Sequence, residues 1–260
     1  MADSVLYEVA EGLATVTLNR PDAMNALDTA TKNALRDALR EAAGDEAVRA
    51  VLLTGKGRAF CVGQDLKEHV EILAAGGGMA TVAEHYNPIA TAIATMRKPV
   101  VAGVNGVAAG AGAGFAFAAD YRIAADTASF NTSFVGVALT ADSGMSWTLS
   151  RLVGFGRAQE LLLFPRAVKA AEALDLGLVH RVVPAAELPA EAAAVARRLA
   201  QGPTLAYAAV KESLAYGADH SLPEALAKED QLQTRAGASQ DHRAAVAAFL
   251  DKTTPRFTGR

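Results

Sequence analysis

Cysteine and clustered basic residues are scarce in this sequence. Cys61 is the single cysteine among 260 residues, so no intramolecular disulfide can form. Residues 1–11 lack the basic-then-apolar layout of a secretory signal, and we therefore expect a cytoplasmic location. Lys and Arg number 25 against 28 Asp and Glu, a net charge of −3, and no basic cluster interrupts that balance. A nucleic acid is therefore not an expected partner.

Long apolar runs and metal-binding motifs are missing as well. Even the apolar segment 100–119 is interrupted by Asn105 and five glycines, and no run reaches the roughly 20 residues that a membrane-spanning helix needs. The five histidines show neither H-x-x-x-H nor Cys-His spacing, so we expect no metal site. Ser143 lies outside any G-x-S-x-G elbow, which argues against a serine hydrolase.

The sequence does contain enough apolar residues, 51% of the chain, to form a large core. Two short β-prone runs, 5–8 and 13–18, are separated by a Glu-Gly pair, which is the pattern of a hairpin. Asp28 is the expected N-cap of an amphipathic helix that continues to Ala43.

The middle of the chain alternates between strand and helix patterns. Unbroken apolar runs at 50–53 and 99–104 are typical of strands covered on both faces, and a helical segment at 81–96 lies between them. This order predicts parallel βαβ units. Residues 121–124 and 179–183 are weaker strand candidates.

The last quarter of the chain shows only helical patterns. We expect a core at 1–184 that holds the active site, and a C-terminal helical region at 185–260. The predicted helices of that region are 186–201, 204–215, 223–236 and 240–252.

Two glycine-bearing loops, 60–66 and 105–114, follow buried strands. Loops after the carboxyl ends of parallel strands are where ligands bind, so both loops are candidates for one site. The second loop leads into an apolar stretch, 115–119, that we expect to continue as a helix. Main-chain amides near Gly110 would then lie unpaired at a helix N-terminus, where they favour an oxygen that gains negative charge.

Two other interpretations of the second loop stay open at this point. Its small residues could simply allow close helix packing. A dinucleotide site is the other alternative, but Gly110, Gly112 and Gly114 form G-x-G-x-G instead of the G-x-G-x-x-G of that motif.

The same two loops resemble the crotonase superfamily of enoyl-CoA hydratases and isomerases. Its members show A-F-x-x-G-x-D-[LI] and N-G-x-A-x-G-[GA]-G, and this chain has AFCVGQDL at 59–66 and NGVAAGAG at 105–112. The resemblance extends from NRPDAMNAL at 19–27 to PRFTGR at 255–260. It implies an α/β crotonase (ClpP/crotonase-like) fold of repeated ββα units, with a C-terminal helical region for trimerisation.

The resemblance also implies a substrate, an acyl-CoA thioester, with no cofactor beyond the coenzyme A that the substrate carries. The main-chain N–H groups of Gln64 and Ala111 would form an oxyanion hole. We expect a homotrimer or a dimer of trimers, in which C-terminal residues of a neighbouring subunit complete the site. The implied CoA-binding residues are Met24, Ala26, Ala59, Phe60, Gly63, Asp65, Leu66, Gly110, Lys252 and Phe257.

The two glutamates that hydratases of this superfamily use are replaced here by Gly114 and Phe134, neither of which can transfer a proton. Asp142 matches the catalytic aspartate of the ring-1,2-epoxyphenylacetyl-CoA isomerases of phenylacetate degradation. Where those relatives commonly have P-D-x-G-G, this chain has Ala141 and Met145 at the first and last positions.

These residues lead to an acyl-CoA isomerase in which Asp142 is the acid and base. An N-cap role for Asp142 on a helix at 143–152 is the structural alternative. Phe134 and Val137, together with Trp147, could line an apolar acyl pocket or belong to the core. A hydratase with a different acid or base group and a non-catalytic acyl-CoA binder remain alternative functions.

Overall fold

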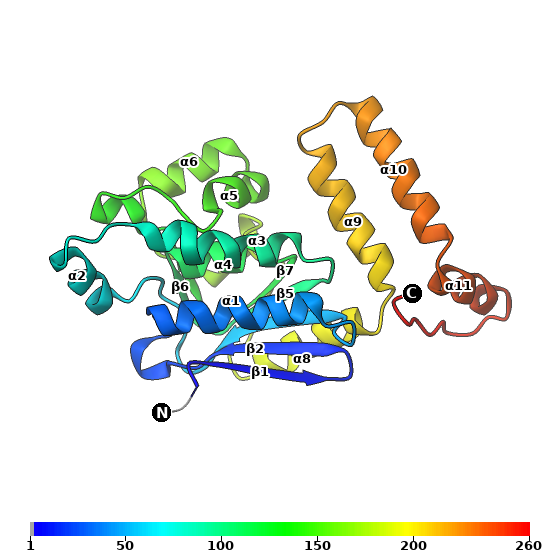
Figure 1. Cartoon of the computed structure of the whole chain (residues 1–260), viewed down its shortest axis with the longest axis horizontal. Coiled ribbons are helices and arrows are strands. Elements are labelled where there is room, and N and C mark those ends of the chain that lie inside the picture. The colour runs from blue at the N-terminus through cyan, green and yellow to red at the C-terminus, as the bar shows by residue number, and fades with distance from the viewer. Residues whose placement is uncertain (1–2) are drawn as a thin grey trace.

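The computed structural model describes residues 3–260 and is built around a six-stranded sheet (Figure 1). Its first two strands form the predicted hairpin, and every other neighbouring pair is parallel. Every residue of the central strand β5 is buried, so both faces of the sheet are covered there, as its unbroken apolar run predicts. In order across the sheet the strands are β1 Val5–Ala10, β2 Leu13–Leu18, β3 Ala50–Gly55, β5 Val100–Val104, β7 Tyr121–Ala125 and β10 Arg181–Val183.

A second, four-stranded sheet stands beside the first; local apolar patterns did not predict its short strands, but it supplies the second strand of the ββα units that the resemblance implies. The segments interpreted as loops at 60–66 and 105–114 begin with short strands of this sheet, which pair in parallel. Both loops therefore start from one hydrogen-bonded frame, and only the residues after the strands are free to bind a ligand. The strands are β4 Ala59–Cys61, β6 Val107–Ala109, β8 Ser129–Asn131 and β9 Val168–Lys169.

Helices cover the sheets. Helix α1 packs against β1 and β2, α3 packs against α1 and α4, and α8 packs against β3, β5 and β7 (Figure 1). The Asp28 carboxylate accepts a hydrogen bond from the Thr31 amide at 2.8 Å, which confirms the predicted N-cap of α1. These helices are α1 Thr29–Gly44, α2 Leu66–Ala74, α3 Asn87–Thr95, α4 Ala111–Ala118, α5 Met145–Val153, α6 Phe155–Leu163, α7 Ala170–Asp175 and α8 Leu188–Ala200.

The helix predicted at 81–96 is divided in two. A π-helical turn, η2 Val82–Tyr86, precedes α3, and the Asn87 amide donates to the Val82 carbonyl five residues earlier. Pro88 follows directly and has no amide hydrogen, so it cannot make the regular bond to Glu84. Apolar spacing does not detect this change of helix type, because the buried side chains continue through it.

The C-terminal helices were predicted correctly. They are α9 Thr204–Gly217, α10 Leu222–Gly237 and α11 Gln240–Leu250, following α8. Helices α9 and α10 form a hairpin that projects from the core (Figure 1). An ion pair of 2.9 Å between Arg151 on α5 and Asp219 links the hairpin's tip region to the core. No helix within residues 3–260 is long and apolar enough to cross a membrane.

Candidate active site

The main-chain amide of Gln64 has no acceptor within residues 3–260. Leu27 pairs with the first loop as an isolated parallel bridge: its amide donates to the Gly63 carbonyl at 2.8 Å, and its carbonyl accepts from the Asp65 amide at 3.1 Å. In such a bridge the residue between the two bonded positions directs its own N–H away from the partner strand. The bridge therefore leaves the Gln64 amide available to a ligand.

The Ala111 amide is also available. Helix α4 begins at Ala111, four residues earlier than its apolar stretch predicts, and Gly110 precedes it with a φ of 51°. The first regular helical bond is donated by the Gly114 amide to the Gly110 carbonyl at 3.1 Å. An N–H group in the first turn has no carbonyl to pair with, and none of the described residues supplies one to Ala111. The positive end of the helix dipole adds to the attraction for an anion.

Gly63 brings the two loops into direct backbone contact. A methyl group placed on Gly63 would lie 3.0 Å from the Ala109 carbonyl oxygen and 3.3 Å from the Ala111 nitrogen. The φ of Gly63 is also +84°, a conformation that side-chain-bearing residues rarely adopt. Gly63 therefore lies against the main-chain nitrogen of Ala111. The amides of Gln64 and Ala111, which have no acceptor within residues 3–260, lie at this junction of the two loops.

Asp142 presents a partly buried carboxylate at the loop before α5. Burial raises the pKa of Asp142, and the hydrogen bond of 2.8 Å from the Ser143 hydroxyl to Oδ1 partly opposes that rise. The N-cap interpretation is wrong: α5 begins at Met145, its N-cap is Gly144, and only the main-chain carbonyl of Asp142 accepts from Met145. The carboxylate is therefore not used to hold the helix.

Helix α4 lies directly against the loop that carries Asp142. A methyl group on Gly114 would lie 2.8 Å from Ser143 Cβ and 3.1 Å from the Ser143 carbonyl oxygen. Ser143 is fully buried and has a φ of +54°. Gly114 is one turn along α4 from Ala111, so it shares that residue's side of the helix. The absence of a side chain at Gly114 is what lets the Asp142 loop approach the helix.

Tyr86 is a residue of this region to which the sequence assigned no role. Its side chain is buried, its hydroxyl donates to Gln64 Oε1, and its ring packs edge-on against Phe115 at 6.1 Å between centroids. Burial raises the pKa of Tyr86 strongly, and the negative charge of Asp142 raises it further, so the hydroxyl stays protonated as a donor. Tyr86 therefore ties the α3 side of the region to the Gln64 side chain.

Several of the expected CoA-binding residues build the first loop. Ala59 and Phe60 are buried in β4, Gly63 is buried at the junction, and Ala26 is buried beside Leu27. Asp65 has a structural role, because its carboxylate caps α2 and pairs with Arg20 at 3.0 Å. Burial acts to raise the pKa of Asp65, but the Arg20 guanidinium and the α2 amides lower it overall.

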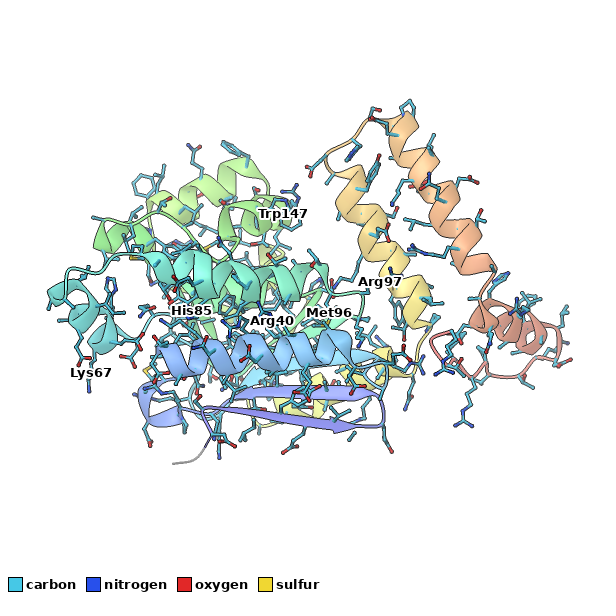
Figure 2. The ribbon with its side chains drawn as sticks, in the orientation of Figure 1. Arg40, Lys67, His85, Met96, Arg97 and Trp147 are labelled. Carbon is cyan, nitrogen blue, oxygen red and sulfur yellow. The ribbon has the colours of Figure 1, made fainter. Side chains whose placement is uncertain are left out.

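Other expected residues lie at the surface of the single chain. Leu66 exposes 69% of its surface and Val137 exposes 65%, whereas Phe134 is packed in the core. Trp147 (Figure 2) lines a groove of about 350 Å³ between α3 and α5. The Arg151 guanidinium lies 3.9 Å from its ring centroid. Met24 has a left-handed φ of +52° in the turn before Ala26.

The C-terminal residues stay apart from the junction. Lys252 and Phe257 follow α11 at the end of the molecule opposite α2, which directly follows the first loop (Figure 1). The Phe257 carbonyl accepts from Arg49 at 2.8 Å. Within one chain these two residues are therefore not brought to Gln64 and Ala111.

No group of three metal-ligating side chains occurs among residues 3–260. Cys61 is completely buried, and burial raises the pKa of its thiol to about 12, so it is not a nucleophile at neutral pH. The groups of this region that can take part in a reaction are the Gln64 and Ala111 amides and the Asp142 carboxylate. They can stabilise an oxyanion and move a proton.

The family model described as enoyl-CoA hydratase/isomerase matches residues 8–260 of this chain. A Rhodobacter capsulatus protein named probable enoyl-CoA hydratase is 45% identical over 258 residues, 99% of this chain and 98% of that one. The 1,2-epoxyphenylacetyl-CoA isomerase of Escherichia coli is 37% identical and covers 100% of both chains. A crystal structure described as an enoyl-CoA hydratase/isomerase from Mycobacterium abscessus superposes with a TM-score of 0.96 at 47% identity, covering 98% of this chain and 100% of its own.

Proposed function

We propose that this chain, which belongs to the enoyl-CoA hydratase/isomerase family, is an acyl-CoA isomerase that acts through a thioester enolate. One observation carries the proposal: the main-chain amides of Gln64 and Ala111, which have no acceptor within residues 3–260, lie at a junction whose helix also contacts the loop of the partly buried Asp142 carboxylate. Its reaction moves a double bond or rearranges an epoxide next to the thioester.

In the proposed reaction the thioester oxygen accepts hydrogen bonds from the Gln64 and Ala111 amides. The Asp142 carboxylate removes a proton from the carbon beside the carbonyl, and the electron pair of the broken C–H bond forms the enolate. The carboxyl exchanges its proton with solvent and then delivers a proton to another carbon while the enolate collapses and the double bond shifts. One carboxylate is sufficient because the same group removes one proton and delivers one, and no water is added.

Position 114 supports isomerisation over two-carboxylate hydration. The space that a side chain at Gly114 would need is already occupied by Ser143, at 2.8 Å from the added carbon. A glutamate there would have to displace the loop that carries Asp142. At position 134 the side chain is a buried phenyl ring, which cannot bind or activate water through a proton transfer.

The second candidate function is an enoyl-CoA hydratase with a different acid or base group. The name of the 45% identical Rhodobacter capsulatus relative favours it. Incubation with crotonyl-CoA and with 3-hexenoyl-CoA separates the two functions. An isomerase shifts the double bond of the 3-enoyl thioester and leaves crotonyl-CoA without water addition, whereas a hydratase converts crotonyl-CoA to the 3-hydroxy thioester.

The Asp142→Asn variant tests the proposal directly. It keeps the shape of the side chain and an oxygen that can accept from the Ser143 hydroxyl, but it removes the ability to carry the proton. We expect turnover of 3-hexenoyl-CoA to fall by about 10²- to 10⁴-fold, with binding of the thioester retained. Thioester binding is measured by calorimetry. Wild-type turnover in Asp142→Asn would remove this residue from the mechanism, and binding without turnover in the wild-type protein across several acyl chains would indicate a non-catalytic binder.

For the substrate, the first loop with Ala59, Phe60 and Leu66 is the proposed binding site of the coenzyme A portion. Lys252 and Phe257 are proposed to reach that portion from a neighbouring subunit, because they lie far from this loop in their own chain. An aromatic acyl group is proposed from the name of the E. coli relative. A co-crystal with phenylacetyl-CoA tests each of these contacts.

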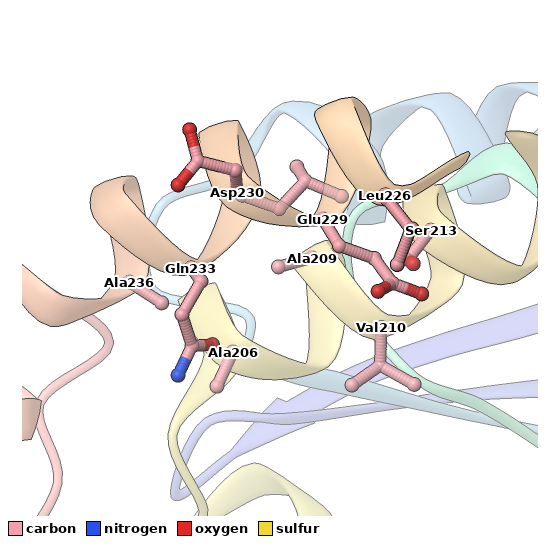
Figure 3. A pocket seen from close by; sticks show the side chains of 10 residues that line it. Ala206, Ala209, Val210, Ser213, Leu226, Glu229, Asp230, Gln233 and Ala236 are labelled. Carbon is pink, nitrogen blue, oxygen red and sulfur yellow. The ribbon is translucent and has the colours of Figure 1, made fainter. Parts of the chain in front are cut away.

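The C-terminal helices α9 to α11 support a homotrimer or a dimer of trimers. Large apolar side chains of these helices remain uncovered, including Phe249 at 82% and Leu250 at 73% exposure. A groove of about 530 Å³ runs between α9 and α10 with Val210 and Leu226 on its walls (Figure 3). Exposed apolar patches of this kind mark protein interfaces. Sedimentation of the wild-type protein and of Phe249→Glu tests the assembly: we expect a trimer or hexamer that the variant weakens, and a monomeric wild-type protein would refute it.

A further inference from the structure

A fully buried lysine lies beneath the first loop. Lys32 belongs to α1 and is 0% exposed. Its ammonium contacts three side chains that are far away in the sequence: Glu68 Oε1 at 3.0 Å, Thr81 Oγ1 at 3.0 Å and Gln64 Oε1 at 3.3 Å. Thr81 also contacts His85, which lies between α3 and α1 (Figure 2). The lysine therefore joins α1, the first loop, α2 and the turn before α3.

Burying an ammonium costs several kcal/mol unless hydrogen bonds and an opposite charge compensate for it. Glu68 supplies the charge, and its own pKa is lowered by the Thr29 amide and by Lys32, against the opposing effect of burial. A Lys–Glu pair alone could satisfy the ammonium at less cost near the surface. With Thr81 and Glu68, Gln64 supplies the third acceptor for the three N–H groups of the ammonium, so the burial of Lys32 and the position of the Gln64 side chain depend on each other.

The side chain of Gln64 is fixed at both ends. Its Oε1 accepts from Tyr86 and Lys32, two donors that approach from different helices. Its Nε2 makes longer contacts to the Asp65 carbonyl at 3.3 Å and to Glu68 at 3.4 Å. A glutamine in a glycine-bearing loop normally samples several rotamers, and here the buried donors select one. Fixing the side chain also restricts the main-chain torsions of the residue that carries it.

We propose that Lys32 and Tyr86 are positioning residues that act through the Gln64 side chain to keep the Gln64 main-chain N–H directed into the active site. This inference rests on the proposed function, in which that N–H stabilises the enolate. Neither Lys32 nor Tyr86 touches the reacting atoms in this arrangement. The Leu27 bonds hold the main chain on both sides of Gln64, and the contacts of the Gln64 side chain add to them by restricting rotation of the residue itself.

The test combines Tyr86→Phe with Gln64→Ala, which removes the side chain but keeps the main-chain amide. We expect Tyr86→Phe to lower kcat for 3-hexenoyl-CoA isomerisation about 10-fold, with KM changed less than about threefold, because a misdirected donor weakens transition-state binding. In the Gln64→Ala background the same substitution should change kcat less than about twofold. An equal 10-fold loss in both backgrounds would show that Tyr86 acts without Gln64 and would overturn the inference.

Lys32→Met removes the other donor to Gln64 Oε1 and so tests the positioning role a second time. Lys98→Met is its matched control. Lys98 is another buried lysine, whose ammonium donates to the Ala42 carbonyl at 2.6 Å at the end of α1. Both variants lose a buried cation, and we expect both to be less stable. Only Lys32→Met should lower kcat, by about 10-fold. Equal kcat values in the two folded variants would refute a positioning role for Lys32.

A spectroscopic measurement separates this inference from the proposed function. Butyryl-CoA labelled with ¹³C at the carbonyl has no double bond to move, so the infrared stretch of the bound thioester reports only on carbonyl polarisation. We expect a shift to lower wavenumber in the wild-type protein and a smaller shift in Tyr86→Phe. No shift in the wild-type protein would refute the oxyanion hole itself. A full shift in both proteins would refute only the positioning role.

Discussion

The contact between Gly114 and Ser143 gives the sharpest test of how the site is built. In Gly114→Ala the added carbon would lie 2.8 Å from Ser143 Cβ, whereas non-bonded carbons rest about 3.5 to 4.0 Å apart. The loop or the helix must therefore yield by roughly 0.7 Å or more. Because Asp142 precedes Ser143, its carboxylate is expected to move with the loop.

A displacement of about 1 Å at a reacting group costs on the order of 100-fold in rate, so we expect kcat for 3-hexenoyl-CoA to fall about 30- to 100-fold in Gly114→Ala. The overpacked contact should also cost about 1–3 kcal/mol of unfolding free energy. The rate is followed by the absorbance of the 2-enoyl thioester, and stability by urea unfolding. Gly156→Ala in α6 is the control, since its added methyl group meets nothing within 4 Å, and its kcat should match the wild type. A folded Gly114→Ala enzyme with wild-type kcat would refute the dependence of Asp142 on this contact.

Three further predictions concern the same junction. In Ser143→Ala the Asp142 carboxylate loses the hydroxyl hydrogen bond that lowers its pKa. The acid limb of the plot of kcat/KM against pH should therefore move to higher pH. An unmoved limb would exclude Asp142 as the titrating base. Burial raises the folded-state pKa of Asp142, so its ionised form weakens the fold at neutral pH. Asp142→Asn should therefore raise the unfolding free energy at pH 7, and this gain should shrink as pH falls through the folded-state pKa and be gone at the unfolded-state pKa of about 4. Gly63→Ala forces a φ of +84° on alanine and brings its methyl group to 3.0 Å from the Ala109 carbonyl oxygen. The variant should lose at least about 1 kcal/mol of unfolding free energy in chemical unfolding and have a lower kcat. Unchanged stability and kcat would mean that the two loops are not in close contact.

Much of the fold follows from local patterns in the sequence. The hairpin, α1 with its Asp28 cap, the buried strands β3 and β5 and the C-terminal helices each span enough residues for their periodicity to be recognised. The second sheet could not be recognised from local patterns, because its strands of two or three residues are too short to show alternation. Such strands exist only through their pairing with distant neighbours, which a local pattern does not contain.

The candidate site divides in the same way. Free amides near Gly110 could be expected from a glycine-bearing loop that leads into a helix, whereas the Gln64 amide was implied only by the family resemblance; both are unpaired within residues 3–260. The network around Lys32 could not, because a buried lysine has the same helical spacing as an exposed one. Tyr86 looks like an ordinary core aromatic until its hydroxyl is found on Gln64. For Asp142 the local helix pattern was misleading, since Gly144 takes the cap position.

The central claim is that Asp142 moves a proton between carbons of an enolate held by the two amides. Its most direct test is the conversion of 3-hexenoyl-CoA in D₂O, followed by NMR and mass spectrometry in the wild-type and Asp142→Asn proteins. The account predicts 2-hexenoyl-CoA with deuterium next to the thioester or at the γ carbon, no hydroxylated product, and almost no exchange in Asp142→Asn. A 3-hydroxyacyl product as the main species, or equal exchange in the two proteins, would contradict it.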